Sequence, residues 1–244
     1  MTSRVAVVGA TGKLGGLAAD LIDRTEGFEV TARLSSKDGL DALADADLVV
    51  DMTVPVVSPT IVEAALSAGK PVLVGTSGWN AERLAKLGHR LAELPDLGVI
   101  VVPNFSVGSV LATRFAAIAG RYFDSVEIIE AHAATKIDSP SGTATRTAEL
   151  ITAARAELGP VAAPHVDQRA RGQQVASIPV HSMRMSGIVA QQDVVFGGEG
   201  EVLRLTHQTI SGRSYEAGIL AALRALPDAR GLTVGLDAIL GLDD

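Results

Sequence analysis

The chain has 244 residues, of which 47% are hydrophobic and 20% charged, with a formal net charge of −7 at pH 7 and no cysteine. This length accommodates one large domain or two modest ones, each with a hydrophobic core. Without cysteine, disulfide scaffolds, cysteine-based zinc sites and thiol chemistry are excluded, and the composition is compatible with a reducing compartment. No metal site is predicted.

Charge and hydropathy also argue against two classes of partner. Apolar residues occur in short runs such as 99–102, far below the roughly 18 residues that cross a membrane. Glycines follow the first apolar run from Gly9 onward, where a signal peptide would continue its apolar segment. The chain has 21 Lys and Arg residues and 3% aromatic residues, too few for the basic and stacking surfaces of nucleic-acid-binding proteins. We therefore predict a soluble, cytoplasmic protein that binds neither membrane nor nucleic acid.

The first hundred residues alternate short apolar runs with helical patterns, which is typical of βαβ units and a parallel sheet. Strands are predicted at 4–8, 28–32, 48–51, 72–74 and 97–102. Ser58 is predicted to be the N-cap of a helix that begins at Pro59 and ends before Gly69, and Asn80 is predicted to cap the next helix.

The pattern changes after Pro103. Helices are predicted at 106–120, after the turn-rich segment 137–142 and through Leu150, and at 214–226. A surface loop is predicted at 159–172. Segments 125–131, 177–182, 187–196 and 202–210 read as strands of a mixed or antiparallel sheet. The predicted fold class is therefore α/β, with a Rossmann-type parallel-sheet domain and an α+β domain that contains a mixed sheet.

The sharpest local motif is the glycine-rich segment from Gly9 to Gly15, directly after the first predicted strand. Glycines there permit a tight turn, and the following helix offers its N-terminal N–H groups to a pyrophosphate. Its spacing, G-x-x-G-x-x-G, is a variant of the usual dinucleotide fingerprint. A glycine-rich turn without a ligand is the alternative, but the βαβ context favours dinucleotide binding.

The end of the second strand bears on the choice of dinucleotide. An acidic residue there would bind a ribose 2′-hydroxyl, whereas an arginine would pair with a 2′-phosphate. This chain has Arg33 there, with Ser35, Ser36 and Lys37 nearby and no acid before Asp38. The pattern favours NADPH, with NADH possible; the alternative is that Arg33 and Lys37 are ordinary surface charges.

Two further loops follow predicted parallel strands, at 75–78 and 103–106. Since the carboxyl ends of such strands share one edge of the sheet, these loops are candidates for a nicotinamide pocket, or they are merely connections.

A second cluster of polar residues spans 130–144. Ser141, Gly142 and Thr143 enter a predicted helix, whose N–H groups and hydroxyls suit a carboxylate. Lys136 is a candidate counter-charge or proton donor, and His132 a candidate acid or base near neutral pH. The residues alone leave open that His132 is structural and Lys136 solvated.

With these motifs in place, the sequence resembles the dihydrodipicolinate reductase (4-hydroxy-tetrahydrodipicolinate reductase) family over essentially its whole length. The matching segments are 9–15, 51–55, 75–78, 103–106 and 136–144, the last being highly specific. Shorter matches follow around Val180 to Arg184, Phe196 to Glu201 and Gly231.

The resemblance implies a dinucleotide-binding domain at 1–105 and 215–244, and a substrate-binding domain at 106–214 that builds a homotetramer. The reaction it implies is NAD(P)H-dependent reduction of an unsaturated cyclic dicarboxylate to tetrahydrodipicolinate in lysine and diaminopimelate biosynthesis. By the same resemblance His132 is the proton donor and acceptor and Lys136 the second proton donor. The residues implied to hold substrate are Lys136, Ser141, Gly142 and Thr143. The implied cofactor contacts are Gly9, Ala10, Thr11, Gly12, Lys13, Leu14, Arg33, Gly75, Thr76, Ser77, Val102, Pro103, Asn104 and Phe105.

The chain departs from the family pattern beside His132. The family usually has a second histidine at the next position, where this chain has Ala133, followed by Ala134 and Thr135. Loss of a hydrogen bond to a bound carboxylate costs about 1–3 kcal/mol, so substrate affinity and identity stay open. Two alternatives therefore remain, a reductase of a different small unsaturated dicarboxylate and a non-catalytic NADP-binding sensor.

Overall fold

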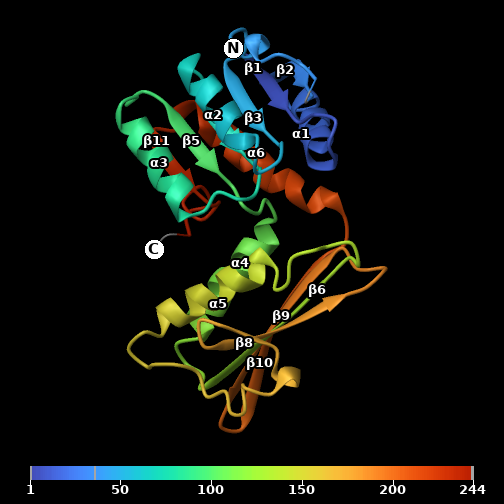
Figure 1. Cartoon of the computed structure of the whole chain (residues 1–244), viewed down its shortest axis with the longest axis vertical. Coiled ribbons are helices and arrows are strands. Elements are labelled where there is room, and N and C mark those ends of the chain that lie inside the picture. The colour runs from blue at the N-terminus through green and yellow to red at the C-terminus, as the bar shows by residue number, and fades with distance from the viewer. Residues whose placement is uncertain (1, 36, 243–244) are drawn as a thin grey trace. The chain divides into compact units, whose positions relative to one another are not determined.

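The structure is a computed structural model that describes residues 2–35 and 37–242 (Figure 1). The chain divides into two compact units, one formed by Met1–Val107 with Tyr215–Asp244 and the other by Gly108–Ser214. The sequence placed the first boundary after residue 105. Each unit is described separately below.

The first unit contains a six-stranded parallel sheet in the order β11-β5-β4-β3-β1-β2. The strands are β1 (Ser3–Val8), β2 (Phe28–Leu34), β3 (Leu48–Asp51), β4 (Val72–Val74), β5 (Gly98–Val101) and β11 (Gly231–Val234). The strand order reverses at β1, because β2 lies on one side of it and β3 on the other. In open parallel sheets such a reversal is where ligands bind.

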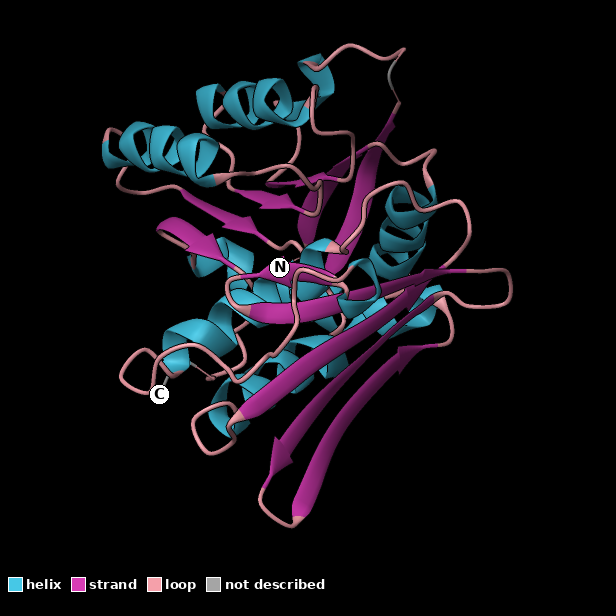
Figure 2. Cartoon of the chain, turned by 60° about the horizontal axis from the view of Figure 1, so that its bottom comes forward, coloured by secondary structure: helices cyan, strands magenta, loops and turns pink. Residues whose placement is uncertain are grey.

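Helices pack on this sheet, as Figure 2 shows. They are α1 (Lys13–Asp23), α2 (Ser58–Ser67), α3 (Ala81–Ala92) and α6 (Glu216–Ala225). Leu66 of α2 and Leu91 of α3 join a buried cluster with alternate strand residues such as Val49 and Val74. The central strands β3, β4 and β5 are buried along their length, which explains why they read as continuous apolar runs.

The start of α2 corrects one expectation. Ser58 is the first helical residue rather than the N-cap, which is Val57 and makes no side-chain capping bond. The Ser58 hydroxyl instead donates to the buried carboxylate of Asp51 and accepts a 2.9 Å hydrogen bond from Trp79 Nε1. The Asp51 carboxylate thus accepts the hydroxyl proton, and the Trp79 indole donates to the hydroxyl oxygen, which a capping bond would otherwise use as its acceptor. The cap predicted at Asn80 is confirmed, since its side chain accepts from Arg83 N at 3.0 Å.

The strand β11 was expected only as a tail. It pairs in parallel with β5 from Gly231 opposite Gly98 to Val234 opposite Val101. Gly98 permits this approach, because a Cβ there would overlap the backbone of Ala229. Four residues carry too weak a local pattern to indicate a strand whose partner lies more than a hundred residues earlier.

The second unit contains a five-stranded mixed sheet in the order β10-β9-β6-β8-β7, in which only β6 and β8 are parallel. Its strands are β6 (Ser125–His132), β7 (Gln173–Val175), β8 (Ile178–Arg184), β9 (Ala190–Gly198) and β10 (Glu201–Thr209). Strand β7 is too short to show a pattern in the sequence. The mixed sheet expected from the sequence is confirmed.

Helices α4 (Val107–Ala119) and α5 (Gly142–Ala154) belong to the second unit's core. Ile151 of α5 packs in one cluster with Ile128, Val194 and Phe196 of the sheet. The residues between these strand positions point to the other face of the sheet. No helix in the described ranges has the length and apolarity needed to cross a membrane.

Candidate functional site

The glycine-rich loop connects β1 to α1 and leaves little space for side chains. Gly9 has a φ of +85°, and a Cβ on it would overlap the carbonyl oxygen of Met52. A Cβ on Gly15 would overlap the carbonyl oxygen of Gly9, so the first turn of α1 packs directly on the loop. Gly12 is the N-cap and supplies no side-chain acceptor. The backbone N–H groups at the N-terminus of α1 are therefore suited to bind an anionic ligand.

The loops after four strands meet at one edge of this sheet. Gly75 follows β4, and a Cβ on it would come within 2.6 Å of Phe105 Cε2 and would overlap the Met52 sulfur. Met52 follows β3 and also neighbours Gly9, so the loops after β1, β3, β4 and β5 lie together. The structure thus brings the predicted cofactor segments of this unit to the strand-order reversal.

Burial separates the predicted cofactor residues into two groups. Thr76, Val102 and Phe105 are buried, and Thr76 Oγ1 donates to the Asp51 carbonyl at 3.4 Å. These three residues pack in the interior, where they support the loops without being exposed to a ligand. The other residues of the predicted set are half-buried or exposed and can therefore reach a ligand. They are Gly9, Ala10, Thr11, Gly12, Lys13, Leu14, Arg33, Gly75, Ser77, Pro103 and Asn104.

Arg33 lies at the end of β2, where its guanidinium contacts two carboxylates of α1. Nη1 donates to Asp20 Oδ1 at 3.0 Å and Nη2 to Asp23 Oδ2 at 2.6 Å. The nearby Ser35 hydroxyl donates to Asp38 at 2.7 Å. Ser36 lies outside the described residues. The sequence reading missed Asp20 and Asp23, although their spacing of three on the exposed side of a helix was a signal.

In the second unit, His132 ends β6 and Glu130 lies two residues earlier on the same face. Glu130 is fully buried, and its Oε2 lies 2.6 Å from His132 Nδ1. Arg184, at the end of β8, donates to both carboxylate oxygens at 2.8 Å. Burial opposes ionisation of Glu130, but hydrogen bonds from Arg184, Ser182, His132 and Ser141 outweigh it and lower the pKa of Glu130 to about 2.

Lys136 follows in a turn closed by its N–H on the Ala133 carbonyl at 3.0 Å. Its ammonium donates to Asp138 Oδ1 at 2.7 Å, which lowers the pKa of Asp138. Arg184 Nη2 also donates to the Asp138 carbonyl at 2.6 Å. Arg184 therefore connects Glu130 to the turn that carries Lys136.

The start of α5 is organised by Ser141. This residue is almost fully buried, its hydroxyl accepts from Ala144 N at 3.2 Å, and its own N–H donates to Glu130 Oε1 at 3.1 Å. Both polar groups of Ser141 thus serve the protein itself. Gly142 is exposed and Thr143 half-buried in the first turn that Ser141 caps. The structure brings His132 and the start of α5 together through Glu130.

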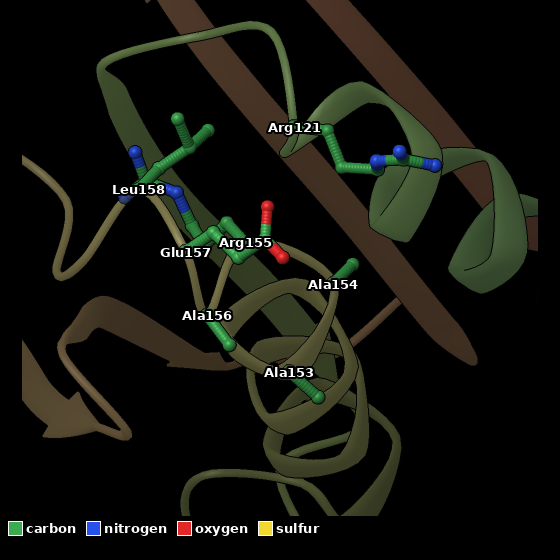
Figure 3. Close-up of a pocket in the computed structure, with 7 residues that line it drawn as sticks. All are labelled: Arg121, Ala153, Ala154, Arg155, Ala156, Glu157 and Leu158. Atoms are coloured by element: carbon green, nitrogen blue, oxygen red, sulfur yellow. The ribbon is translucent and has the colours of Figure 1, made fainter.

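One pocket in the second unit lies away from these residues. A pocket of about 410 Å³ lies at the C-terminal end of α5, lined by Arg121 and residues 153–158 (Figure 3). It contains none of the predicted site residues, because Gly142 begins the opposite end of that helix.

Models of known families match nearly the whole chain. The model described as "Dihydrodipicolinate reductase, N-terminus" matches residues 3–105, and the one described as "Dihydrodipicolinate reductase, C-terminus" matches residues 108–240. The chain belongs to the dihydrodipicolinate reductase family.

Relatives in this family cover the chain from end to end. A 4-hydroxy-tetrahydrodipicolinate reductase of Clavibacter michiganensis is 59% identical over 243 residues, which are 100% of this chain and 88% of the relative. One from Streptomyces griseus is 43% identical over 98% of both chains. These relatives confirm the reductase family and the oxidoreductase function expected from the sequence.

Solved structures agree. A dipicolinate-bound dihydrodipicolinate reductase from Paenisporosarcina is similar with a TM-score of 0.83 and 31% identity, over 98% of this chain and 100% of that one. A scyllo-inositol dehydrogenase from Lactobacillus casei, at 13% identity and a TM-score of 0.63 over 99% and 95% of the two chains, shares the fold alone. The predicted fold class is confirmed.

The sequence reading of this family member missed the roles of Glu130 and Arg184. Arg184 fell within a segment that matches the family's order and Glu130 within the polar cluster at 130–144, and neither was given a function. Glu130 precedes His132 by two residues in a predicted strand, and this spacing places both on one face. Arg184 had no local signal, because its partner Glu130 is 54 residues earlier in the chain.

Proposed function

We propose that the chain reduces 4-hydroxy-tetrahydrodipicolinate, through dihydrodipicolinate, to tetrahydrodipicolinate in the synthesis of lysine and diaminopimelate. The observation that carries this proposal is the similarity over the full chain to relatives named for that reaction. The buried cluster of Glu130, His132 and Ser141 supports it, since an ordered acid or base beside a helix start suits a carboxylate substrate.

The first unit fits an NAD(P)H cofactor. The loop from Gly9 to Gly15 has no space for side chains at Gly9 and Gly15, and no side-chain cap occupies the N-terminus of α1, so the N–H groups there fit a pyrophosphate. The residues proposed to hold the cofactor are those predicted from the sequence. Of these, the buried residues Thr76, Val102 and Phe105 support the loops that contact it. When bound, the nicotinamide supplies a hydride to a ring carbon of the substrate.

We propose a modest preference for NADPH, with NADH also accepted. A 2′-phosphate would find the guanidinium of Arg33, which favours NADPH. Asp20 and Asp23 already share that charge and place two negative charges near the phosphate position. The preference is therefore smaller than an unpaired arginine would produce.

His132 and Lys136 are the proposed proton donors. The proton goes to the substrate carbon adjacent to the carbon that accepts the hydride. His132 Nδ1 is held by Glu130, so its Nε2 is the nitrogen that exchanges a proton with the substrate. Lys136 is a second donor, and its ammonium also attracts a substrate carboxylate. Both residues belong to the second unit.

The start of α5 is proposed to hold a substrate carboxylate. Gly142 and Thr143 supply first-turn N–H groups, and Ser141 caps the helix that aims them. Ala133 lacks the side-chain hydrogen bond that the family's second histidine would make. We therefore expect weaker substrate binding than in relatives that have this histidine.

We also propose a cytoplasmic homotetramer. The sheet face opposite α4 and α5 alternates polar with apolar residues, and Met183 on it is 43% exposed. An open sheet face of this kind is suited to pack against a second copy.

To test this proposal, the rates of NADPH and NADH oxidation are measured side by side with freshly generated 4-hydroxy-tetrahydrodipicolinate. We expect turnover with both, faster with NADPH, and loss of rate in His132→Ala and Lys136→Ala. Cofactor binding without oxidation would contradict the proposed reaction and favour a different dicarboxylate or a sensor.

A further inference from the structure

Glu130 connects three segments that are distant in sequence. It accepts from His132 on its own strand β6, from the backbone of Ser141 at the start of α5, and from Arg184 at the end of β8. No part of its side chain is exposed. This fully buried carboxylate therefore contacts both the proposed proton donor and the helix start that is proposed to bind the substrate carboxylate.

We propose that Glu130 is a positioning residue, which keeps the proton of neutral His132 on Nδ1 and fixes the start of α5 beside it. This inference rests on the roles proposed above for His132 and Gly142. It assigns Glu130 the task of holding a proton donor and an anion-binding helix start in one rigid arrangement.

The tautomer follows from the chemistry of the contact. An ionised carboxylate has only acceptors, so at 2.6 Å the His132 nitrogen must be the donor. The neutral ring then carries its proton on Nδ1 and presents a lone pair at Nε2. Proton gain and loss therefore occur at Nε2, as the proposed reaction requires, while the Nδ1 bond holds the ring in one orientation.

The second oxygen of Glu130 performs the other task. Oε1 accepts the Ser141 N–H at 3.1 Å, and Arg184 clasps both oxygens and also the Asp138 carbonyl. Arg184 balances the buried charge, so that the carboxylate stays ionised without a proton from His132. The turn that carries Lys136 is thereby tied to the same carboxylate.

Glu130→Gln tests the proposal, because the amide keeps the shape but loses the charge and one acceptor. Glu127→Gln is a matched control. Glu127 lies on the same strand and likewise bonds an arginine and a histidine, Arg171 at 2.5 Å and His181 at 2.7 Å, but on the opposite face.

The first readout is the ¹⁵N chemical shift of the His132 ring, identified by its loss in His132→Gln. We expect the Nδ1–H tautomer in the wild type and in Glu127→Gln, and the Nε2–H tautomer in Glu130→Gln. A wild-type ring protonated on Nε2 when neutral would overturn the proposal, and this test holds even if Glu130→Gln does not fold.

The second readout is steady-state turnover. We expect kcat of Glu130→Gln to fall about 10–100-fold and KM for substrate to rise, while KM for cofactor stays unchanged. A kcat within about twofold of the wild type would also overturn the proposal. Because the ring spectrum needs no substrate, absence of turnover in the wild type would contradict the proposed reaction and not the positioning role.

Arg184→Lys separates the two tasks. The ammonium keeps the positive charge but cannot bridge both Glu130 oxygens and the Asp138 carbonyl. We expect the His132 tautomer to stay on Nδ1 and KM for substrate to rise. A shift of the tautomer in this variant would contradict the assignment of that task to Glu130 alone.

Discussion

The guanidinium of Arg33 and the carboxylate of Asp23 form a 2.6 Å ion pair, with Asp20 as a second partner at 3.0 Å. An arginine at the end of this strand would ordinarily indicate NADPH. In this chain the same arginine is also the partner of two acids, so that a 2′-phosphate must compete with them.

The double variant Asp20→Asn, Asp23→Asn is expected to increase the preference for NADPH. Removing two exposed negative charges frees Arg33 for the phosphate, and exposed pairs of this kind change affinities by about two- to fivefold. The ratio of kcat/KM for NADPH to that for NADH measures the effect. Glu82→Gln, which removes the exposed partner of Lys86 on α3, is the control and should leave the ratio unchanged. An unchanged ratio in the double variant would contradict the competition.

Gly15→Ala is expected to abolish tight cofactor binding. Its Cβ would overlap the carbonyl oxygen of Gly9 and push α1 away from the loop. We expect the Kd for NADPH, measured by fluorescence titration, to rise by about tenfold or more. Gly88→Ala is the control, because that helical glycine in α3 has open space around its Cβ position. It should stabilise the protein by about 0.5–1 kcal/mol and leave the Kd unchanged.

Ser58→Ala is expected to destabilise the first unit. The hydroxyl connects Asp51 to Trp79, and its loss leaves a buried acceptor and an indole donor without this partner. The expected cost is about 1–3 kcal/mol in urea denaturation. Trp79 is the only tryptophan, so its emission should report the change directly. Ser67→Ala, on the exposed end of the same helix, should change neither property.

The stability of the protein is expected to fall in acid partly through Glu130. Its pKa of about 2 in the folded state lies below its ordinary value of 4.5, so the unfolded chain takes up the proton first as the pH falls. The stabilisation is complete above about pH 4.5 and is lost as the pH falls toward 2, by about 3 kcal/mol in total. Glu130→Gln should flatten this part of the pH dependence in urea denaturation. An unaltered acid slope would show that Glu130 is not its source.

Met183→Asp is expected to disrupt the proposed tetramer. Its side chain lies on the open face of the second unit's sheet, where a charge would have to be buried between copies. Light scattering after size-exclusion chromatography should give a tetramer for the wild type and smaller species for the variant. Val56→Asp, on an exposed loop of the first unit, serves as the control. A monomeric wild type would contradict the proposal.

The sequence by itself determined the elements with strong local signals. The strands ending at Asp51 and Val74 have the predicted bounds, because the apolar runs 48–50 and 72–74 are bounded by aspartates in the first case and by a proline and a glycine in the second. Asn80 caps its helix as predicted, since capping depends on residues within one turn. The ordered local motifs, of which the segment 136–144 is the most specific, indicated the family.

Tertiary structure decided whatever depends on partners that are distant in the chain. The Ser58 hydroxyl joins a buried contact with Asp51 and with Trp79, 21 residues later, instead of capping its helix, and β11 became a strand only through its pairing with β5. Arg184 meets Glu130 only because β6 and β8 lie side by side. Local propensity acts over a few residues, whereas burial and ion pairing act between segments that only the fold brings together.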